Sequence, residues 1–287
     1  MSDITAFLCN YVFRYRRSVI EINLARSFPT LKYQEIKKIR KEYYKYMFDI
    51  AFESIWVVNA SDKQISKMVK INNPDRFDAF CKKHNKIIVV MGHCGNWELL
   101  SGGIGVKEKR KEDSFGNNSI YITYKQLANK SFDELFIKMR MRLYKKFGNP
   151  GGLLESKNIL RHVLKNKEEK SIYIFIADQS PMKERVVTKF LNQPTLMFAG
   201  AEYLATKLNL PMVYLGMNRV KRGEYEIDLK PICESPNGIP HGNLTRDFAA
   251  LLEEDINNNK VNWLWSHKRW KKGLSPEEKE EYDRICL

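Results

Sequence analysis

The chain has 287 residues, and its 49 Lys and Arg residues outnumber its 34 Asp and Glu residues, which gives a formal net charge of +15. Hydrophobic residues make up 43% of the chain and aromatic residues 12%, a composition that excludes disordered and fibrous proteins. No apolar run approaches the ~18 residues that span a bilayer, so the printed sequence predicts no transmembrane helix. Five cysteines without a Cys-x-x-Cys pair indicate a reducing compartment.

The excess positive charge limits the partners that the chain can have. Nucleic acid, an anionic membrane surface and an acidic carrier protein are all compatible with it. The sequence contains no zinc finger, no RNP sequence and no KH loop, so we expect no nucleic-acid partner.

The first thirty residues combine an apolar stretch with arginines. Ile4–Phe13 is mostly apolar and is followed by Arg14, Arg16 and Arg17. This order is typical of an interfacial helix at an anionic membrane, but an ordinary core helix has the same pattern, and the residues alone leave both interpretations open. Apolar residues at helical spacing then predict a long amphipathic helix over residues 33–58.

From residue 85 onward the pattern alternates between strands and helices. Strands are predicted at residues 87–91, 120–124, 172–177, 212–217 and 225–232. Helices are predicted at residues 132–147, 158–165, 200–208 and 245–258. This alternation is typical of an α/β fold. We therefore expect a helical N-terminal region, residues 1–70, followed by an α/β domain, residues 71–287, in one structural unit.

The stretch Val90–Glu98 carries the clearest chemical signal. His93 and Glu98 are five positions apart, which places them on different faces of a helix or of a strand. Gly92 and Gly95 permit a turn that brings the two together, with His93 at the end of a strand and Glu98 in the first turn of the following helix. The carboxylate would then hold one imidazole nitrogen and leave the other free as a base.

Three other interpretations of this stretch compete with the catalytic one. His93 can be a structural histidine in the loop between a strand and a helix. His93 and Glu98 can be metal ligands, but their spacing is not that of an HExxH site and a third ligand is not evident, so we expect no metal ion. Cys94 can be a nucleophile, although neighbouring side chains at a strand end diverge.

Four blocks of the sequence together carry a family resemblance. The first two are Tyr15–Pro29, which contains a Tyr-Arg-Arg and an Asn-Leu pattern, and Gly92–Glu98, which contains the His and the Glu. The third is Ile176–Pro181, which contains Asp-Gln. The last, the closing block, is Asn262–Trp270, which contains Trp, His and Arg-Trp residues. In this order they resemble the lipid A biosynthesis acyltransferases, the lauroyl/myristoyl or late acyltransferases of the lysophospholipid acyltransferase superfamily, in a Bacteroidetes-like form. The resemblance covers about residues 12–272 and implies a central mixed sheet flanked by helices.

The resemblance implies the transfer of a fatty acyl group from a thioester, on acyl carrier protein or CoA, to a hydroxyl of a lipid A precursor. It assigns His93 as the general base and Glu98 as the carboxylate that orients it and stabilises the imidazolium. Backbone N–H groups after His93 are the expected donors to the oxyanion. No cofactor is expected beyond the thioester donor, and no covalent acyl-enzyme is required.

Further polar residues are expected to bind the substrates. The acceptor carries phosphates, so Lys125, after a strand, and Arg140, in a helix, are its predicted cationic contacts. Asp178 and Gln179 directly follow an apolar strand, where site residues of α/β proteins gather, although the same residues also suit a simple turn. The predicted substrate-binding residues are Asn96, Lys125, Arg140, Asp178, Gln179 and Arg269.

The tryptophans and cations of the closing block are compatible with two roles. Trp263, Trp265 and Trp270 alternate with basic residues that include Arg269, as in an interfacial belt at a membrane. The tryptophans are equally suited to a packed core.

The expected location is the cytoplasmic face of the cell inner membrane, peripheral or through an N-terminal anchor. Family members usually begin with a hydrophobic segment, so we expect either missing upstream sequence or attachment through Ile4–Phe13 and basic charge. Acyl carrier protein, an anionic membrane surface and the lipid acceptor are the expected partners, and the oligomeric state is left open.

Three other functions remain beside this one. The acceptor can be another lipid, such as a lysophospholipid, an ornithine lipid or an aryl lipid. The chain can be a metal-dependent hydrolase with His93 and Glu98 as ligands. It can also be a non-catalytic basic protein that binds membranes or nucleic acid, which leaves the turn between His93 and Glu98 unexplained.

Overall fold

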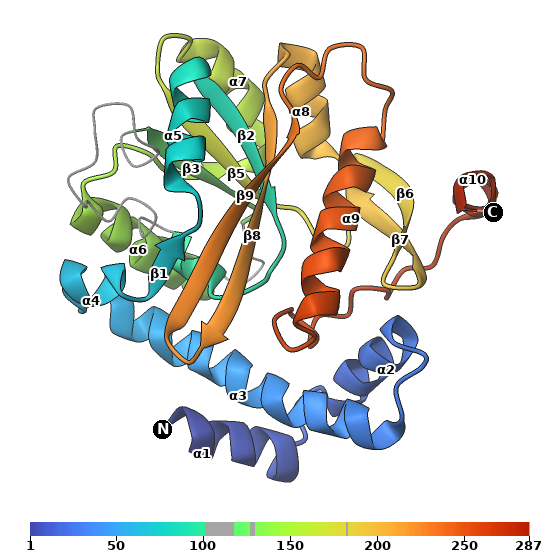
Figure 1. The fold of residues 1–287 in the computed structure, drawn as a ribbon. Helices are drawn as coiled ribbons and strands as arrows, with labels where there is room; N and C mark the ends of the chain where they lie inside the picture. The colour runs from blue at the N-terminus through green and yellow to red at the C-terminus, as the bar shows by residue number, and fades with distance from the viewer. Residues whose placement is uncertain (101–117, 127–129, 182, 287) are drawn as a thin grey trace.

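The computed structural model of the chain describes residues 1–100, 118–126, 130–181 and 183–286. Within these residues a seven-stranded sheet forms the centre of the molecule (Figure 1), in the order β1-β9-β8-β2-β5-β3-β4. Its strands are β1 (Val69–Ile71), β2 (Lys86–Met91), β3 (Ser119–Tyr124), β4 (Gly152–Glu155), β5 (Ser171–Ile176), β8 (Met212–Lys221) and β9 (Glu224–Cys233). The β8–β9 pair is antiparallel and the other neighbours are parallel, so the expected mixed sheet is confirmed.

Helices surround this sheet, and a separate hairpin of two strands lies beside it (Figure 1). The hairpin consists of β6 (Arg185–Phe190) and β7 (Gln193–Phe198). The longer helices are α2 (Arg17–Ser27), α3 (Tyr33–Val57), α5 (Pro74–Lys83), α6 (Lys130–Phe147), α8 (Gly200–Leu208), α9 (Asn243–Asn258) and α10 (Pro276–Cys286). The shorter ones are α1 (Ser2–Phe7), the π-helix η1 (Leu8–Val12), α4 (Asp62–Ser66), the 3₁₀-helices η2 (Trp97–Leu100) and η5 (Ser156–Asn158), and α7 (Ile159–Lys165).

Strand β2 is buried on both faces of the sheet. Ile88 and Val90 join one hydrophobic cluster with side chains of α7, α8, α9 and the N-terminal helices. Ile87 and Val89 join a second cluster with side chains of α4, α5 and α6. Because successive residues of a strand point to opposite faces, a strand covered on both sides is a continuous apolar run, as the sequence of β2 is.

The N-terminal helices form a layer against the sheet, with α3 running past the ends of β8 and β9 (Figure 1). Asp49 of α3 pairs with Arg219 at 2.6 Å and with Arg222 at 2.9 Å, and Arg222 also pairs with Asp3 of α1 at 2.6 Å. These ion pairs connect α1 and α3 to the β8–β9 hairpin. The expected boundary at residue 70 falls within β1, which pairs with β9.

The strands predicted from residue 85 onward correspond to β2, β3, β5, β8 and β9, and the predicted helices to α3 and α6–α9. The hairpin β6–β7 was missed because its turn does not have the usual Asn-Gly sequence. Leu191 and Asn192 adopt φ values of +50° and +58° there, the conformation of a two-residue hairpin turn. The charged Lys189 in β6 and Pro194 in β7 further weaken the sequence pattern from which strands are predicted.

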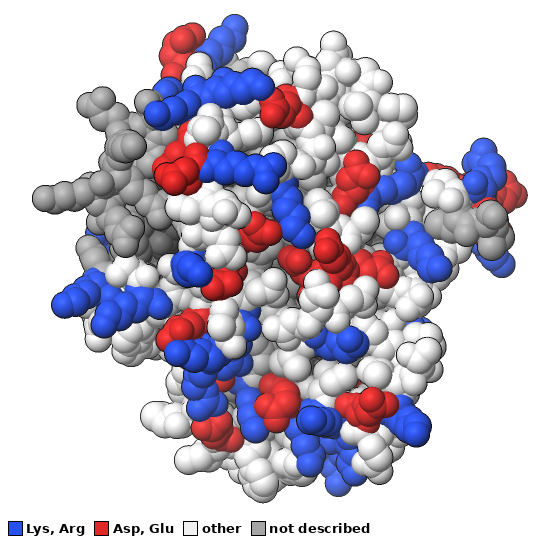
Figure 2. Space-filling view, viewed as in Figure 1, with Lys and Arg blue, Asp and Glu red and all other residues white. Residues whose placement is uncertain are grey.

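The described part of the chain contains no helix with the length and hydrophobicity to cross a bilayer. On the face shown in Figure 2, basic side chains are spread widely, with acidic ones between them. The positive charge of this face is therefore distributed rather than concentrated in one patch.

The buried carboxylate of Glu202, in α8, caps the first turn of α9. It accepts hydrogen bonds from the backbone N–H groups of Gly242 and Thr245 and from the Thr245 hydroxyl.

Glu202→Gln would turn amide hydrogens towards these donors, so we expect the free energy of unfolding to fall by about 2 kcal/mol in urea denaturation. The control is Glu254→Gln at an exposed position of α9, which should change it by less than about 0.5 kcal/mol. Equal losses in the two variants would contradict the capping role.

Candidate active site

His93 and Asp178 occupy equivalent positions on neighbouring parallel strands. β2 and β5 pair without a shift up to their last residues, Met91 and Ile176. His93 and Asp178 each follow two positions after the end of their strand. The register therefore brings both side chains to the carboxyl edge of the sheet, where sites of α/β proteins lie.

The carboxylate of Asp178 is the centre of this site. Its Oδ1 accepts a hydrogen bond from His93 Nδ1 at 2.5 Å, and its Oδ2 accepts from the His93 backbone N–H at 2.9 Å and from Trp263 Nε1 at 2.8 Å. Burial alone would raise the pKa of this carboxyl, but the charge and hydrogen bonds of His93 and the Trp263 indole outweigh burial and lower its pKa to about 2. Asp178 is therefore an ionised, firmly oriented acceptor at neutral pH.

The imidazole of His93 has the arrangement of a general base. An ionised carboxylate only accepts hydrogen bonds, so Nδ1 carries the proton that His93 shares with Asp178, and Nε2 of the neutral ring has the lone pair. The amide nitrogen of Gln179 lies 3.1 Å from Nε2. Gln179 is exposed whereas Asp178 is buried, so Nε2 faces the accessible side. Of these two predicted substrate contacts, the structure leaves Gln179 accessible and makes Asp178 the partner of His93.

Glu98 does not hold His93, so the predicted contact between them is wrong. The Glu98 carboxylate forms a bidentate ion pair with Arg140, from Nε at 2.9 Å and from Nη2 at 2.6 Å. Glu98 lies in the first turn of η2 as expected, but its side chain is directed to α6. The pair also occupies the edge of the Arg140 guanidinium that was expected to bind a phosphate.

The turn between β2 and η2 is held by α3 and by the closing block. Gly95 has a φ of +61°, and a side chain at this position would collide with Met217. Its carbonyl accepts a hydrogen bond from the Tyr46 hydroxyl at 2.8 Å, and its N–H donates to Asn262 Oδ1 at 3.1 Å. The Gly95 N–H is thereby occupied, so the prediction that N–H groups after His93 bind the oxyanion is wrong for this group.

Two further predicted substrate contacts are buried and bonded to the protein. Asn96 donates to Glu53 of α3 at 2.9 Å, because its side chain points into the molecule. Arg269 donates to the Leu196 carbonyl of β7, and burial lowers the pKa of its guanidinium to about 10. Both residues therefore support the fold around the site. Lys125, in contrast, is exposed directly after β3.

Residues of the N-terminal block hold the closing block in place. Asn23 of α2 donates to the carbonyls of Trp265 and His267, both at 2.9 Å, and Arg16 donates to the Ser266 carbonyl at 2.9 Å. The closing block in turn reaches Asp178 through Trp263. The four sequence blocks are therefore neighbours in one hydrogen-bonded assembly around His93.

Sequence reasoning did not pair His93 with Asp178 and gave Trp263 no role in the site. The signal for the first was partial, since both residues follow an apolar strand, but the predicted strand 172–177 ends one residue later than β5 and concealed their equal offset. No local signal marks Trp263, because its contact with Asp178 joins residues that are 85 positions apart and depends on how the closing block folds back.

The structure also bears on two alternative interpretations of this stretch, a cysteine nucleophile and a metal site. Burial raises the pKa of the Cys94 thiol well above its usual value, so Cys94 is not a thiolate near neutral pH. His93 and Glu98 have different partners, Asp178 and Arg140, and do not converge as ligands. Among the residues that the structure describes, no three His, Cys, Asp or Glu side chains gather as a cation site.

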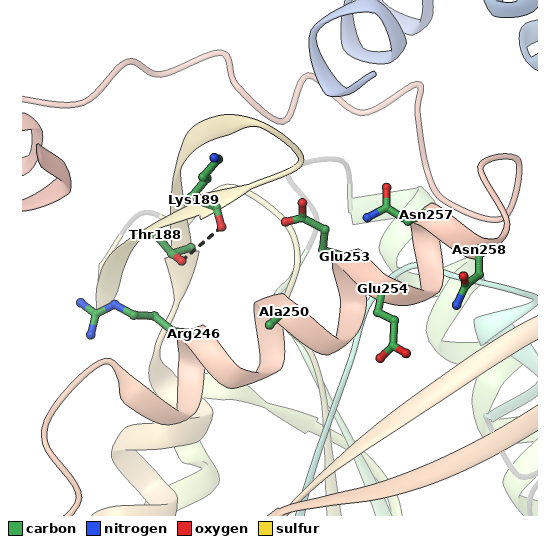
Figure 3. Close-up of a pocket in the computed structure, with 8 residues that line it drawn as sticks. All are labelled: Thr188, Lys189, Arg246, Ala250, Glu253, Glu254, Asn257 and Asn258. Atoms are coloured by element: carbon green, nitrogen blue, oxygen red, sulfur yellow. Dashed lines mark hydrogen bonds between the residues drawn. The ribbon is translucent and has the colours of Figure 1, made fainter. Parts of the chain in front are cut away.

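A pocket between β6 and α9 shares no residue with this site (Figure 3). It is lined by Thr188, Lys189, Arg246, Ala250, Glu253, Glu254, Asn257 and Asn258. Arg246 donates to the Val187 carbonyl, and Glu253 accepts from the Leu191 N–H. Charged side chains of this pocket therefore attach the β6–β7 hairpin to α9.

Comparison with known proteins gives a match over nearly the whole chain. Residues 1–272 match the family described as bacterial lipid A biosynthesis acyltransferase. The match includes the N-terminal helices, the His93–Asp178 pair and the closing block. No curated protein matches the chain.

The ionised Asp178 makes the stability of the fold depend on pH. Its pKa is about 2 in the folded chain, below the usual value of 3.8, so the unfolded chain binds the proton more strongly. The carboxylate therefore stabilises the fold above about pH 4, and this contribution is lost as the pH falls through about 2. We expect wild type to lose about 1 kcal/mol of unfolding free energy relative to Asp178→Asn between pH 6 and pH 3.

Urea denaturation at the two pH values measures this difference. Asp247→Asn, at an exposed position of α9, is the control and should show the same difference from wild type at both. A difference between wild type and Asp178→Asn that is independent of pH would contradict the assignment of a depressed pKa to Asp178.

Proposed function

Since the chain belongs to the bacterial lipid A biosynthesis acyltransferase family, we propose that it transfers a fatty acyl group from a thioester to a hydroxyl of a lipid A precursor. The proposal rests on the His93–Asp178 pair, with a basic nitrogen on the accessible side and an ionised carboxylate behind it. Such a pair removes a proton from a hydroxyl and stabilises the resulting imidazolium.

In the proposed reaction the acceptor hydroxyl takes the place of the Gln179 amide beside His93 Nε2. Its oxygen attacks the thioester carbonyl carbon while its proton moves to Nε2, and Asp178 stabilises the charge of the ring. The tetrahedral intermediate then collapses, the C–S bond breaks, and Nε2 returns the proton to the leaving thiolate. The products are an ester and a free thiol, so a covalent acyl-enzyme on the buried Cys94 is not needed.

Gln179 is our candidate for a donor to the oxyanion. Its amide lies next to Nε2 and is exposed, so it can turn towards the carbonyl oxygen once a hydroxyl binds. The Gly95 N–H cannot take this part because it is bonded to Asn262.

We assign the Glu98–Arg140 pair to shaping the acceptor side of the site. The bidentate pair joins η2, which follows His93, to helix α6 and so fixes the position of both. Lys125, after β3 at the same edge of the sheet, supplies a cation for the phosphates that a lipid A precursor carries.

The N-terminal helices support binding of the chain to a membrane that contains the acceptor. Ile4, Phe7, Val12 and Phe13 have side chains that are 58–70% exposed, and the exposed Arg14 follows them directly. Exposed apolar groups next to cations suit an anionic leaflet. Because the same layer holds the closing block, we propose peripheral binding at the cytoplasmic face of the inner membrane with the site near the leaflet.

We propose acyl carrier protein as the carrier of the thioester, with CoA as the alternative. The support is the net charge of +15, which favours association with an acidic partner. Basic side chains are widely distributed on the face in Figure 2, so this support concerns the chain as a whole and not one docking patch.

Comparing matched variants in one acyl-transfer assay tests the roles of the site residues. We expect His93→Ala to lower turnover by ~10²–10⁴-fold and Asp178→Asn by at least ~10²-fold, because each removes half of the proton-transfer pair. Glu98→Gln should cost about tenfold or less, since Glu98 acts through Arg140. His162→Ala in α7, which contacts Tyr121 and Tyr173, is the control and should stay within about twofold of wild type.

The acceptor is identified by mass spectrometry of total lipids from cells with and without the gene, restored by wild type or by His93→Ala. Loss of one acyl chain from lipid A, restored by wild type alone, supports the proposal. An acyl chain missing from another lipid class would keep the mechanism and change the acceptor. Full restoration by His93→Ala, or a larger loss for Glu98→Gln than for Asp178→Asn, would contradict the proposed pair.

Vesicle flotation tests the proposed membrane surface. We expect the double variant Phe7→Ser and Phe13→Ser to bind vesicles of phosphatidylglycerol at least tenfold more weakly than wild type, because two large apolar contacts are lost. Added salt should weaken wild-type binding as well. The control is Leu164→Ser in α7, where a 48% exposed leucine lies away from the N-terminal helices (Figure 1). Equal binding by wild type and the double variant would exclude this surface.

A further inference from the structure

The two oxygens of the Asp178 carboxylate have separate partners. Oδ1 accepts from His93 Nδ1, whereas Oδ2 accepts from the His93 backbone N–H and from the Trp263 indole. The backbone donor is on the same residue as the imidazole. The indole is therefore the donor that ties Asp178 to a different part of the chain.

Trp263 is itself fixed on all sides. Its side chain is 1% exposed and makes edge contacts with Phe190, Trp265 and Trp270, with ring centroids 5.8, 4.7 and 5.9 Å away. Its backbone forms a bridge with Cys94, the residue after His93. The indole N–H is thus held at one place relative to both members of the pair.

We propose that Trp263 is a positioning residue of the acyl transfer: its indole N–H fixes Oδ2 so that Oδ1 alone faces the His93 imidazole. This inference rests on the proposed function of the pair. With the indole in place, the carboxylate cannot turn about its Cβ–Cγ bond, and Nδ1–H keeps a single partner throughout the proton transfer. Part of the carboxylate charge is also neutralised by the indole, which limits how strongly Asp178 holds the shared proton.

Removing the N–H while keeping an aromatic ring tests this role. We expect Trp263→Phe to lower kcat about tenfold with KM within about twofold of wild type, since Trp263 touches Asp178 and not a substrate. The matched control is Tyr214→Phe, which removes a donor from another buried carboxylate, since the Tyr214 hydroxyl donates to Asp255 Oδ2 at 2.7 Å. It should leave kcat within about twofold of wild type at equal folded fraction.

The pH profile separates positioning from mere stabilisation of the fold. A carboxylate with one donor fewer holds the proton of the pair more strongly, so more alkaline solution is needed to free Nε2. We therefore expect the acid limb of kcat/KM to move to higher pH, by up to about one unit, in Trp263→Phe and not in Tyr214→Phe. A purely structural role would lower the melting temperature and leave this limb in place.

A second variant covers the case in which the smaller ring prevents folding. Benzothienylalanine in place of Trp263 keeps the shape of the indole and replaces its N–H by sulfur, and it should reproduce the loss in kcat and the shift of the acid limb. A wild-type profile and turnover in this variant would overturn the proposal, as would equal effects in Trp263→Phe and Tyr214→Phe. His93→Ala in the same assay distinguishes a failure of this inference from a failure of the proposed function, because full activity of His93→Ala would refute the proposed function itself.

Discussion

The unshifted parallel pairing of β2 with β5 determines where the candidate active site forms. Both strands are apolar on both faces, so a shift of one residue would move every side chain to the wrong cluster. This strict register carries over to the two residues beyond each strand. His93 and Asp178 thus meet without any special sequence between them, and the packing of the sheet is what sets the 2.5 Å contact.

Burying a carboxylate costs free energy unless hydrogen bonds satisfy its oxygens. The residues around Asp178 supply these hydrogen bonds. The donors come from the His93 turn and from the closing block, and the closing block is held by α2 through Asn23. Glu98 is close to His93 in sequence, but its carboxylate is bonded to Arg140 in a bidentate pair and not to His93. The turn after β2 therefore contributes to two separate pairs, His93 with Asp178 and Glu98 with Arg140, and the second connects η2 to α6.

Local patterns predicted most of the fold, because apolar runs and helical spacing are properties of neighbouring residues. They placed His93 just after a strand and Glu98 in the first turn of a helix, as the structure does. They could not give the order of strands in the sheet, so the partner of His93 was assigned to the nearest carboxylate in sequence. Asn96 and Arg269 were expected to contact a substrate and instead bond to the protein, since a polar residue beside a motif can face inward as easily as outward.

The hydrogen bonds between the N-terminal and closing blocks have a consequence for how the chain becomes functional during synthesis. Arg16 and Ser266 are 250 positions apart, and Asn23 and His267 are 244 apart, so these contacts close almost the entire chain into a loop. Such contacts have high contact order and form late. A nascent chain can pair β2 with β5 and bring His93 to Asp178 well before its last residues emerge. The indole of Trp263, and the docking of α2 against the closing block, must wait until residues up to His267 have left the ribosome.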